Sequence, residues 1–314
     1  MKKVTKKAVK WLVAFVLTLV LTLGIDFALR FTVKPRLSFG FVPSTDESSK
    51  TLIVNMTGVL AHAHESAGPL LQEWEKFGDV LLVDYGDGRF DSELVVERTS
   101  WVIARDIRSR AINNGEKYQR VVFIGSSMGG RLSVDVVREL HKSFDADISG
   151  LQIDLLLLDA PADGSDLVNP FATASKYLYT GPILDHAHLT HFFAGMPKEE
   201  NIEPGVDRGY LKERVQGARS FDFSFFMDET RYIVKLEPLR ANELDGLVDS
   251  VTYIRCNRAN DVVKPGAADK WVLAFPETKI VELDSTHVGF AERPVTWKNL
   301  FHEQLGYLTA SAHQ

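Results

Sequence analysis

Six short runs of apolar residues recur through the sequence, and they constrain the fold more than any other feature. Each run is almost continuous rather than alternating with polar residues; the runs are 51–56, 79–86, 120–125, 153–160, 251–256 and 279–284. Strands of a parallel sheet that is covered on both faces require this composition. Helical patterns separate several runs: Leu132, Val136 and Leu140 stand four residues apart, and the segment 92–115 ends in Asn-Gly, which is typical of a helix end. The sequence therefore predicts an α/β fold with a mostly parallel sheet, helices on both faces and right-handed crossovers.

The alternation of strands and helices stops between residues 162 and 247. This stretch is rich in aromatic residues, and it is not a plain loop, since connections without secondary structure rarely exceed about 15 residues. We expect an inserted, mostly helical cap; the alternative is that the stretch holds further sheet elements. Residues 31–49 mix proline, serine and charge, which is typical of a linker or a short edge element. The predicted organisation is a membrane segment at 1–30, a linker at 31–49, a core formed by 50–161 and 248–314, and a cap at 162–247.

The first thirty residues have the pattern of a membrane-targeting segment, because lysines at positions 2, 3, 6, 7 and 10 precede an apolar run from Trp11 to Ile25. As a helix this run covers about 22 Å, short of the roughly 30 Å hydrocarbon core unless flanking residues contribute. No small-x-small cleavage site follows Gly24, and Asp26 and Arg30 would lie at an interface. A retained anchor with a cytoplasmic N-terminus, and the rest of the chain outside the cytoplasm, is therefore favoured. The alternatives are a cleaved signal peptide, which gives a secreted protein, and a buried helix of the domain.

Charge and cysteine content exclude some classes of protein. The five N-terminal lysines contribute +5 to a formal net charge of −6, so the remainder of the chain carries −11. Binding to phosphates needs a basic face, and the sequence therefore argues against a nucleic-acid partner. The single cysteine, Cys256, excludes an intramolecular disulfide bond, and its place near the end of an apolar run is typical of a small core residue.

The segment FIGSSMGGRL, residues 123–132, places Ser127 between Gly125 and Gly129 where a predicted strand meets a predicted helix. The pattern G-x-S-x-G is informative in this context because it follows four apolar residues and precedes a helical pattern. A turn this tight strains the serine backbone and brings strand and helix so close that side chains at both glycines would clash. The hydroxyl then stands at the carboxyl edge of the sheet, beside the Met128 amide at a helix start, where negative charge is favoured. The alternative is a glycine-rich turn with an incidental serine.

A serine hydroxyl becomes a nucleophile when a base takes its proton and an acid holds that base in one tautomer. We expect His287 as the base, since it follows the last predicted strand, where a loop can reach over the sheet edge. Asp261 is the favoured acid, because the order serine, acid, histidine agrees with the arrangement for this turn. Asp159 and Asp163 are the alternatives.

A second donor to a developing oxyanion is expected from the loop after the first strong strand. Gly58 lets the backbone turn there, and the Val59 amide is the predicted donor, together with that of Met128. The alternative is that Gly58 serves the turn alone.

Together these residues resemble the α/β-hydrolase superfamily over about residues 50–310. The resemblance rests on GSSMGG at the turn, RANDVV around Asp261, DSTHVGF around His287, and an insertion after the run that ends at Asp159. It implies a mostly parallel sheet, no metal or organic cofactor, and acyl-enzyme chemistry on esters, amides or thioesters. Many members carry His-Gly in the oxyanion loop, whereas this chain has Thr57-Gly58.

The predicted function is that of a membrane-anchored serine hydrolase that cleaves a carboxylic ester of a small molecule or a lipid. A tether near acyl chains motivates the lipophilic substrate. One alternative is an acyltransferase that uses the same three residues. Another is a binding protein that has kept the fold and lost the chemistry.

Two further patterns stand in the predicted cap. His186, His188 and His191 invite a metal site, but on a helix the first two project about 200° apart, and no acidic residue stands at a typical zinc spacing. No metal is therefore expected. The aromatic string of the cap is compatible with a hydrophobic core and equally with an acyl-chain pocket; its members are Phe221, Phe223, Phe225 and Phe226.

Overall fold

The structure is a computed structural model, and it describes residues 2–86, 88–115, 117–168, 175, 180–185, 189–192, 196–258 and 262–310. In this part of the chain the named strands form one seven-stranded sheet with the order β1-β3-β2-β4-β5-β6-β7. Their bounds are Ser38–Val42 (β1), Thr51–Met56 (β2), Asp79–Asp84 (β3), Arg120–Ser126 (β4), Gln152–Leu158 (β5), Ser250–Cys256 (β6) and Lys279–Leu283 (β7). Strands β2 to β7 pair in parallel, so the predicted mostly parallel sheet is confirmed. The six predicted runs are β2 to β7, with ends that differ by at most two residues.

Strand β1 corrects the expected linker at 31–49. It pairs antiparallel with β3, from Ser38 opposite Asp84 to Val42 opposite Val80, and so forms one edge of the sheet. Its side chains are half-buried or exposed rather than fully buried. An edge strand that is covered on one face lacks a continuous apolar run, and for that reason it reads as a linker in the sequence. The alternative of a short edge element is the one that the structure has.

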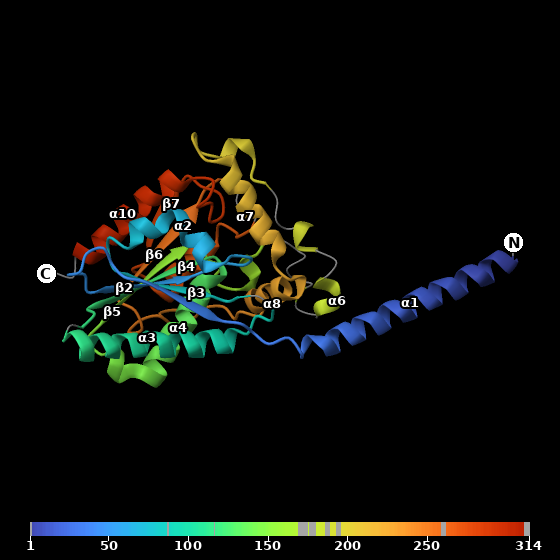
Figure 1. Cartoon of the computed structure of the whole chain (residues 1–314), viewed down its shortest axis with the longest axis horizontal. Coiled ribbons are helices and arrows are strands. Elements are labelled where there is room, and N and C mark those ends of the chain that lie inside the picture. Colours follow the sequence, from blue (N-terminus) through green and yellow to red (C-terminus); the bar gives the residue numbers. More distant parts are fainter. Residues whose placement is uncertain are drawn as a thin grey trace.

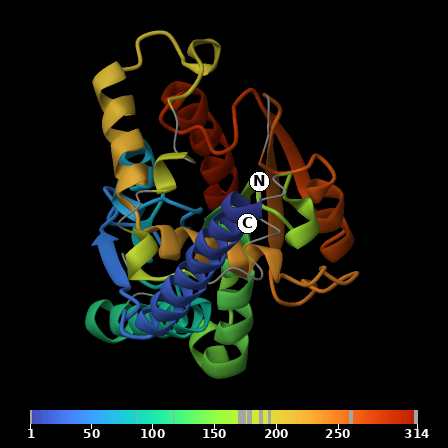
Figure 2. The same cartoon turned by 90° about the vertical axis from the view of Figure 1, so that its right-hand side faces the viewer.

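Two helical layers cover the two faces of the sheet (Figures 1 and 2). Helices α2 and α10 pack on one face and α3, α4 and α9 on the other; they are Ala63–Trp74 (α2), Pro294–Ala310 (α10), Ser92–Asn114 (α3), Met128–Ile148 (α4) and Ala267–Ala274 (α9). Side chains of β4 alternate between the two cores, with Val121 and Phe123 in one and Val122 and Ile124 in the other. Because both faces are covered, every residue of β4 is buried, which explains its continuous apolar sequence.

Helices are the main regular structure in the described part of the segment between β5 and β6. It contains α6 (Pro182–Asp185), α7 (Arg208–Ser220), α8 (Phe223–Val234) and three short 3₁₀ helices at Gly164–Asp166, Leu189–Phe192 and Glu199–Asn201. Apart from isolated bridges at Leu167 and Asp245, its described residues take no part in β-structure. Helices α7 and α8 lie at the end of the sheet from which α1 projects (Figure 1). The expected helical character is thus found in these residues, whereas the cap boundaries stay a prediction.

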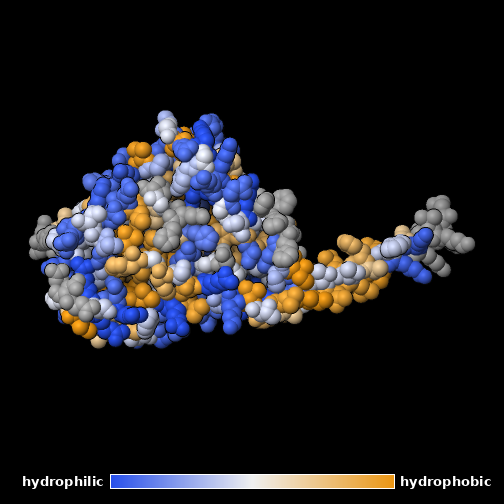
Figure 3. Space-filling view, viewed as in Figure 1, coloured by the Kyte–Doolittle hydropathy of each residue, from blue (hydrophilic) through white to orange (hydrophobic). Residues whose placement is uncertain are grey.

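Helix α1, Lys2–Arg30, projects away from the rest of the molecule (Figure 1). Its portion Lys7–Arg30 is long and apolar enough to cross a membrane, and almost all of it is exposed. Figure 3 shows the helix as a largely hydrophobic rod beside a mostly hydrophilic domain surface. Only its last turns contact the domain, where Asp26 and Arg30 are buried. An exposed apolar helix is not a core helix of the domain, so the interpretation of the first thirty residues as a buried helix is wrong.

Candidate active site

Ser127 stands on a strained turn between β4 and α4. Its φ is 49° and its ψ is −119°, outside the regions that non-glycine residues favour, and its backbone N–H donates to the carbonyl of Leu158 over 2.9 Å. A Cβ on Gly129 would lie 2.1 Å from the Met56 carbonyl oxygen, and one on Gly125 would lie 2.6 Å from Cα of Gly130. The steric reason for both glycines is therefore as expected: β4, α4 and the end of β2 meet too closely for side chains.

Three side chains from distant parts of the sequence form a hydrogen-bonded chain at the carboxyl edge of the sheet. Nε2 of His287 lies 3.0 Å from Oγ of Ser127, and Nδ1 of His287 lies 2.6 Å from Oδ2 of Asp159. Asp159 and Ser127 are only 2% and 7% exposed, and the imidazole is mostly enclosed. If Nδ1 carries the proton and donates it to the carboxylate, Nε2 is left to accept the serine hydroxyl. This arrangement is the one in which a serine loses its proton to a histidine as it attacks.

The carboxylate that contacts His287 is not that of the favoured candidate, Asp261. Asp261 lies outside the described residues, and the contact expected of it is made by Asp159, one of the two alternatives. Asp159 directly follows β5, which is the neighbour of β4 in the sheet, and its φ of 47° marks a sharp change of chain direction there. The order of residues along the chain could not decide this, because the carboxyl ends of β5 and β6 lie at the same edge.

Asp163, the other alternative, has a different partner. Its Oδ2 accepts a hydrogen bond from Nζ of Lys270 at 2.7 Å, and its Oδ1 accepts one from the Ser165 backbone N–H. Burial raises the pKa of Asp163, but hydrogen bonds from Lys270 and Ser165 more than offset this, so its pKa lies below the ordinary value. Asp163 is thus a structural carboxylate beside the site.

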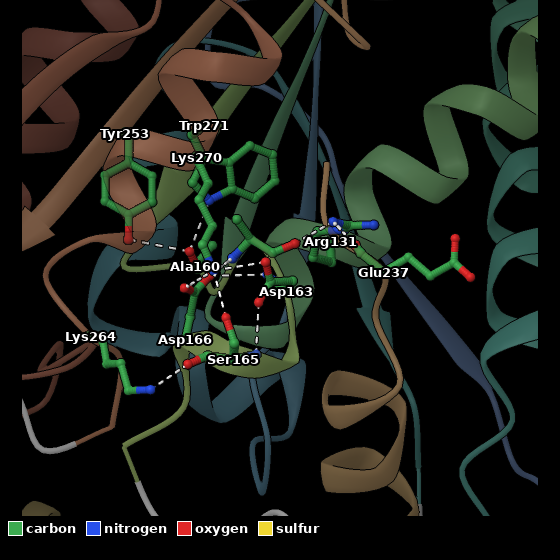
Figure 4. A network of polar contacts seen from close by, with 11 residues as sticks. Arg131, Ala160, Asp163, Ser165, Asp166, Glu237, Tyr253, Lys264, Lys270 and Trp271 are labelled. Carbon is green, nitrogen blue, oxygen red and sulfur yellow. Dashed lines mark hydrogen bonds and ion pairs between the residues drawn. The ribbon is translucent and has the colours of Figure 1, made fainter. Parts of the chain in front are cut away.

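A dense polar network holds the chain immediately after Asp159 (Figure 4). The Ala160 carbonyl accepts from Nε1 of Trp271 at 2.9 Å and from the Tyr253 hydroxyl at 3.2 Å. Arg131, on α4, donates to the Ala162 carbonyl, and Lys270 bridges the carboxylates of Asp163 and Asp166. These contacts join the segment to α4, β6 and α9, the elements that surround it. The network therefore fixes the backbone from which the Asp159 carboxylate reaches His287.

The loop after β2 lies against Ser127 and is held at both ends. A Cβ on Gly58 would be 3.1 Å from Cβ of Ser127, so this glycine allows the loop to approach the serine. The Thr57 carbonyl accepts from the Tyr85 hydroxyl at 3.2 Å, and the Leu60 N–H donates to Oε2 of Glu229 at 3.0 Å. Val59, one expected oxyanion donor, thus lies between two anchored residues. Met128, the other expected donor, is the first residue of α4.

Sequence reasoning missed Tyr85 and Glu229. Tyr85 stands in the motif DYGDGRF, whose position in the sequence is that of an active-site rim loop but whose residues favour a turn, and Glu229 follows an aromatic run in α8. Both side chains are buried, and burial raises the pKa of Glu229 well above its ordinary value, although its hydrogen bond from Leu60 acts in the opposite direction. The sequence gives no clear signal for Glu229, because it stands in the polar run Asp228–Arg231, which is typical of a solvated helix face.

Left-handed backbone is concentrated at this site. The described residues include five non-glycine residues with positive φ, and four of them are Leu60, Ser127, Asp159 and Val288, the last adjacent to His287. Such conformations cost energy and persist only where the surroundings impose them. The clustering singles out this edge of the sheet as the candidate active site.

Three aromatic residues of the cap and Cys256 are part of the packed interior. Phe221, Phe223 and Phe225 are buried, and Phe221 and Phe225 belong to the hydrophobic core on the α4 side, which favours the core interpretation over an acyl-chain pocket. Cys256 is buried as expected, and burial raises its pKa, so its thiol is inert.

No group of three potential metal ligands exists among the residues that the structure describes. His186 and His188 lie outside those residues, as does the side chain of His191.

Comparisons with solved structures define the fold. The chain is similar to a lipase-esterase related protein from Clostridium acetobutylicum, with a TM-score of 0.58 at 13% identity, over 86% of this chain and 98% of that one. It is also similar to a hydrolase from Pseudomonas aeruginosa, with a TM-score of 0.60 at 12% identity (87% and 98% covered). It is similar as well to an enol-lactonase from Burkholderia xenovorans, with a TM-score of 0.59 at 16% identity, over 87% of this chain and 97% of that one. The fold is the α/β-hydrolase fold, as the resemblance implied.

Neither a family model nor a curated protein matches the sequence.

Proposed function

We propose that this protein is a serine hydrolase that cleaves a carboxylic ester through an acyl-enzyme intermediate, with α1 as its membrane anchor. The observation that carries the proposal is the hydrogen-bonded chain from Asp159 through His287 to Ser127, at the carboxyl edge of the sheet. The esterases and hydrolases among the similar structures support the same class of reaction.

In the proposed reaction His287 takes the proton of Ser127 as its oxygen attacks the acyl carbonyl. Asp159 holds the imidazole in position and stabilises its positive charge. The backbone amides of Val59 and Met128 donate to the tetrahedral oxyanion, a contribution of about 10²- to 10³-fold in turnover for one such donor. His287 then gives its proton to the leaving alcohol, which breaks the ester bond. Water repeats the sequence and releases the acid.

The anchor belongs to the same proposal. Lys7–Arg30 is long enough to span a bilayer, and lysines precede it, which favours a cytoplasmic N-terminus and a catalytic domain on the other side. The substrate would be a small-molecule or lipid ester.

A fluorophosphonate probe tests the proposal directly, since it reacts only with an activated serine. The wild-type chain should be labelled, and Ser127→Ala and His287→Ala should lose labelling by several orders of magnitude in rate. Ser149→Ala and His302→Ala are matched controls at exposed positions, and they should label like the wild type. Equal labelling of all five proteins would contradict the assignment. Release of free acid from a short-chain nitrophenyl ester then establishes hydrolysis, whereas acyl transfer to added glycerol would assign the transferase alternative.

A further inference from the structure

The last turns of α1 are docked onto the domain by buried charged groups. Both carboxylate oxygens of Asp26 accept backbone hydrogen bonds at 2.7 Å, from the N–H groups of Gly181 and Ile183 at the start of α6. Asp26 is fully buried, and a Cβ on Gly181 would lie 2.2 Å from the Asp26 carbonyl oxygen. The helix and the start of α6 are therefore in close backbone contact.

Arg30 makes the second half of this junction. Its Nη1 donates to the Thr180 carbonyl at 3.2 Å, and its Nη2 pairs with the carboxylate of Asp228 on α8, which also pairs with Arg231. Arg30 and Asp228 are buried. Two charges leave water only where their partners are fixed, because an unpaired buried charge is strongly unfavourable. A flexible tether would need no such contacts, so the end of α1 is packed against the domain and is more than a free linker.

Helix α8 connects this junction with the candidate active site. Asp228 holds Arg30, and the next residue, Glu229, accepts from the Leu60 N–H in the loop beside Ser127. A single helix thus separates the end of α1 from the carboxyl edge of the sheet. Figure 1 shows α6 and α8 between α1 and the sheet.

The length of α1 places the bilayer next to this edge. The 24 residues of Lys7–Arg30 cover about 36 Å, a little more than the roughly 30 Å hydrocarbon core. The docked turn therefore emerges at the membrane surface. Exposed apolar side chains surround it there, namely Phe27, Phe31 and Ile183, as expected for groups that enter the interfacial region.

We propose that α1 is retained in the mature protein and, through its docked end, holds the carboxyl edge of the sheet against the bilayer, so that the ester substrate is one that resides in the membrane. This inference rests on the proposed function for its chemistry and on the junction for its geometry. The occupant of the apolar surface around Phe31 and Ile183 is the lipid bilayer. A cleaved leader or a loosely tethered domain would leave this surface in water.

Site-specific labelling tests the geometry independently of activity. Cys256 is the only cysteine and is buried, so an introduced cysteine can be labelled selectively. Ile183→Cys probes the junction, and Ile112→Cys, near the end of α3, is the control, because α3 leads to the amino end of β4 at the opposite edge of the sheet. Each full-length variant carries an environment-sensitive fluorophore in phosphatidylcholine–phosphatidylglycerol vesicles that contain nitroxide-labelled lipid. We expect several-fold stronger quenching at position 183 than at 112. Equal quenching at both positions, or a mature chain that begins after residue 30, would overturn the inference.

Activity tests the substrate class. The double variant Asp26→Ala/Arg30→Ala keeps the apolar helix but releases the domain from it. We expect turnover of a long-chain ester dissolved in vesicles to fall roughly tenfold or more, since the domain stays tethered but the carboxyl edge of the sheet is no longer held against the bilayer. Turnover of a soluble short-chain ester should change less than about twofold. Arg208→Ala, which breaks an exposed ion pair with Glu199, is the matched control and should leave both rates unchanged.

The outcomes separate this inference from the proposed function. A wild-type chain without activity on the soluble ester refutes the hydrolase, and the labelling result still decides the orientation. An active chain whose double variant keeps its rate on the vesicle ester refutes the inference alone. If the double variant loses its cooperative thermal transition, the labelling experiment on the otherwise unchanged chain decides.

Discussion

Replacing Asp159 with asparagine tests whether Asp159, which contacts His287, or Asp261, the acid favoured from the sequence, acts on the histidine. The Asp159 carboxylate accepts from Nδ1 of His287 over 2.6 Å and is 2% exposed, so water cannot take its place. An asparagine of the same size keeps the packing, but its amide can donate to Nδ1 and so stabilise the tautomer in which Nε2 carries the proton. That tautomer cannot accept the proton of Ser127.

The expected loss is large. In a serine–histidine–aspartate arrangement this substitution lowers turnover by about four orders of magnitude, which corresponds to about 5 kcal/mol of transition-state stabilisation at 1.36 kcal/mol per factor of ten. The wild type, Asp159→Asn and Asp261→Asn should be compared by turnover of a short-chain nitrophenyl ester and by the rate of fluorophosphonate labelling. Asp261→Asn should stay within about tenfold of the wild type, a loss of no more than about 1.4 kcal/mol. A severe loss in Asp261→Asn together with a mild one in Asp159→Asn would refute this reasoning.

Two further predictions concern stability. Gly129→Ala forces a methyl group against a backbone carbonyl of β2, and we expect a destabilisation of about 1–3 kcal/mol and slower labelling by the probe. Gly266→Ala is the control, because a Cβ there meets open space, and its stability should stay within about 0.5 kcal/mol of the wild type in a thermal-shift assay. Burial raises the pKa of Glu229, so above about pH 4.3 the unfolded chain loses a proton that the folded chain retains, and wild-type stability falls as the pH rises towards the folded-state pKa. Glu229→Gln keeps an acceptor for the Leu60 N–H but does not titrate, so its free energy of unfolding relative to the wild type should rise with pH by up to about 1.4 kcal/mol per pH unit. The exposed control is Glu277→Gln, and both variants are measured between pH 5 and 8. Parallel stability curves for Glu229→Gln and the wild type would argue against a buried titrating group.

The sequence by itself determined the features that depend on local pattern. Five of the seven strands, β2 to β6, follow from nearly continuous apolar runs, because these strands are almost entirely buried. Strand β7 is a mostly exposed edge strand, and it was recognised because three of its five residues are Ile280, Val281 and Leu283. The turn at Ser127 follows from Gly125 and Gly129, whose side chains would meet neighbouring backbone. His287 follows from its place after the last strand. Strand β1 escaped this logic, since a half-exposed edge strand carries little of the pattern.

Only the tertiary structure decided which groups meet. Asp159 and Asp261 both follow strands that end at one edge of the sheet, and their order in the chain does not say which carboxylate reaches the imidazole. Glu229 finds the Leu60 amide across 169 residues, and Arg30 finds Asp228 across 198. The pattern of apolar residues shows which side chains face the core, and this pattern can be recognised within each segment separately. Pairing between polar groups depends on the arrangement of whole elements in space, and no single segment of the sequence encodes it.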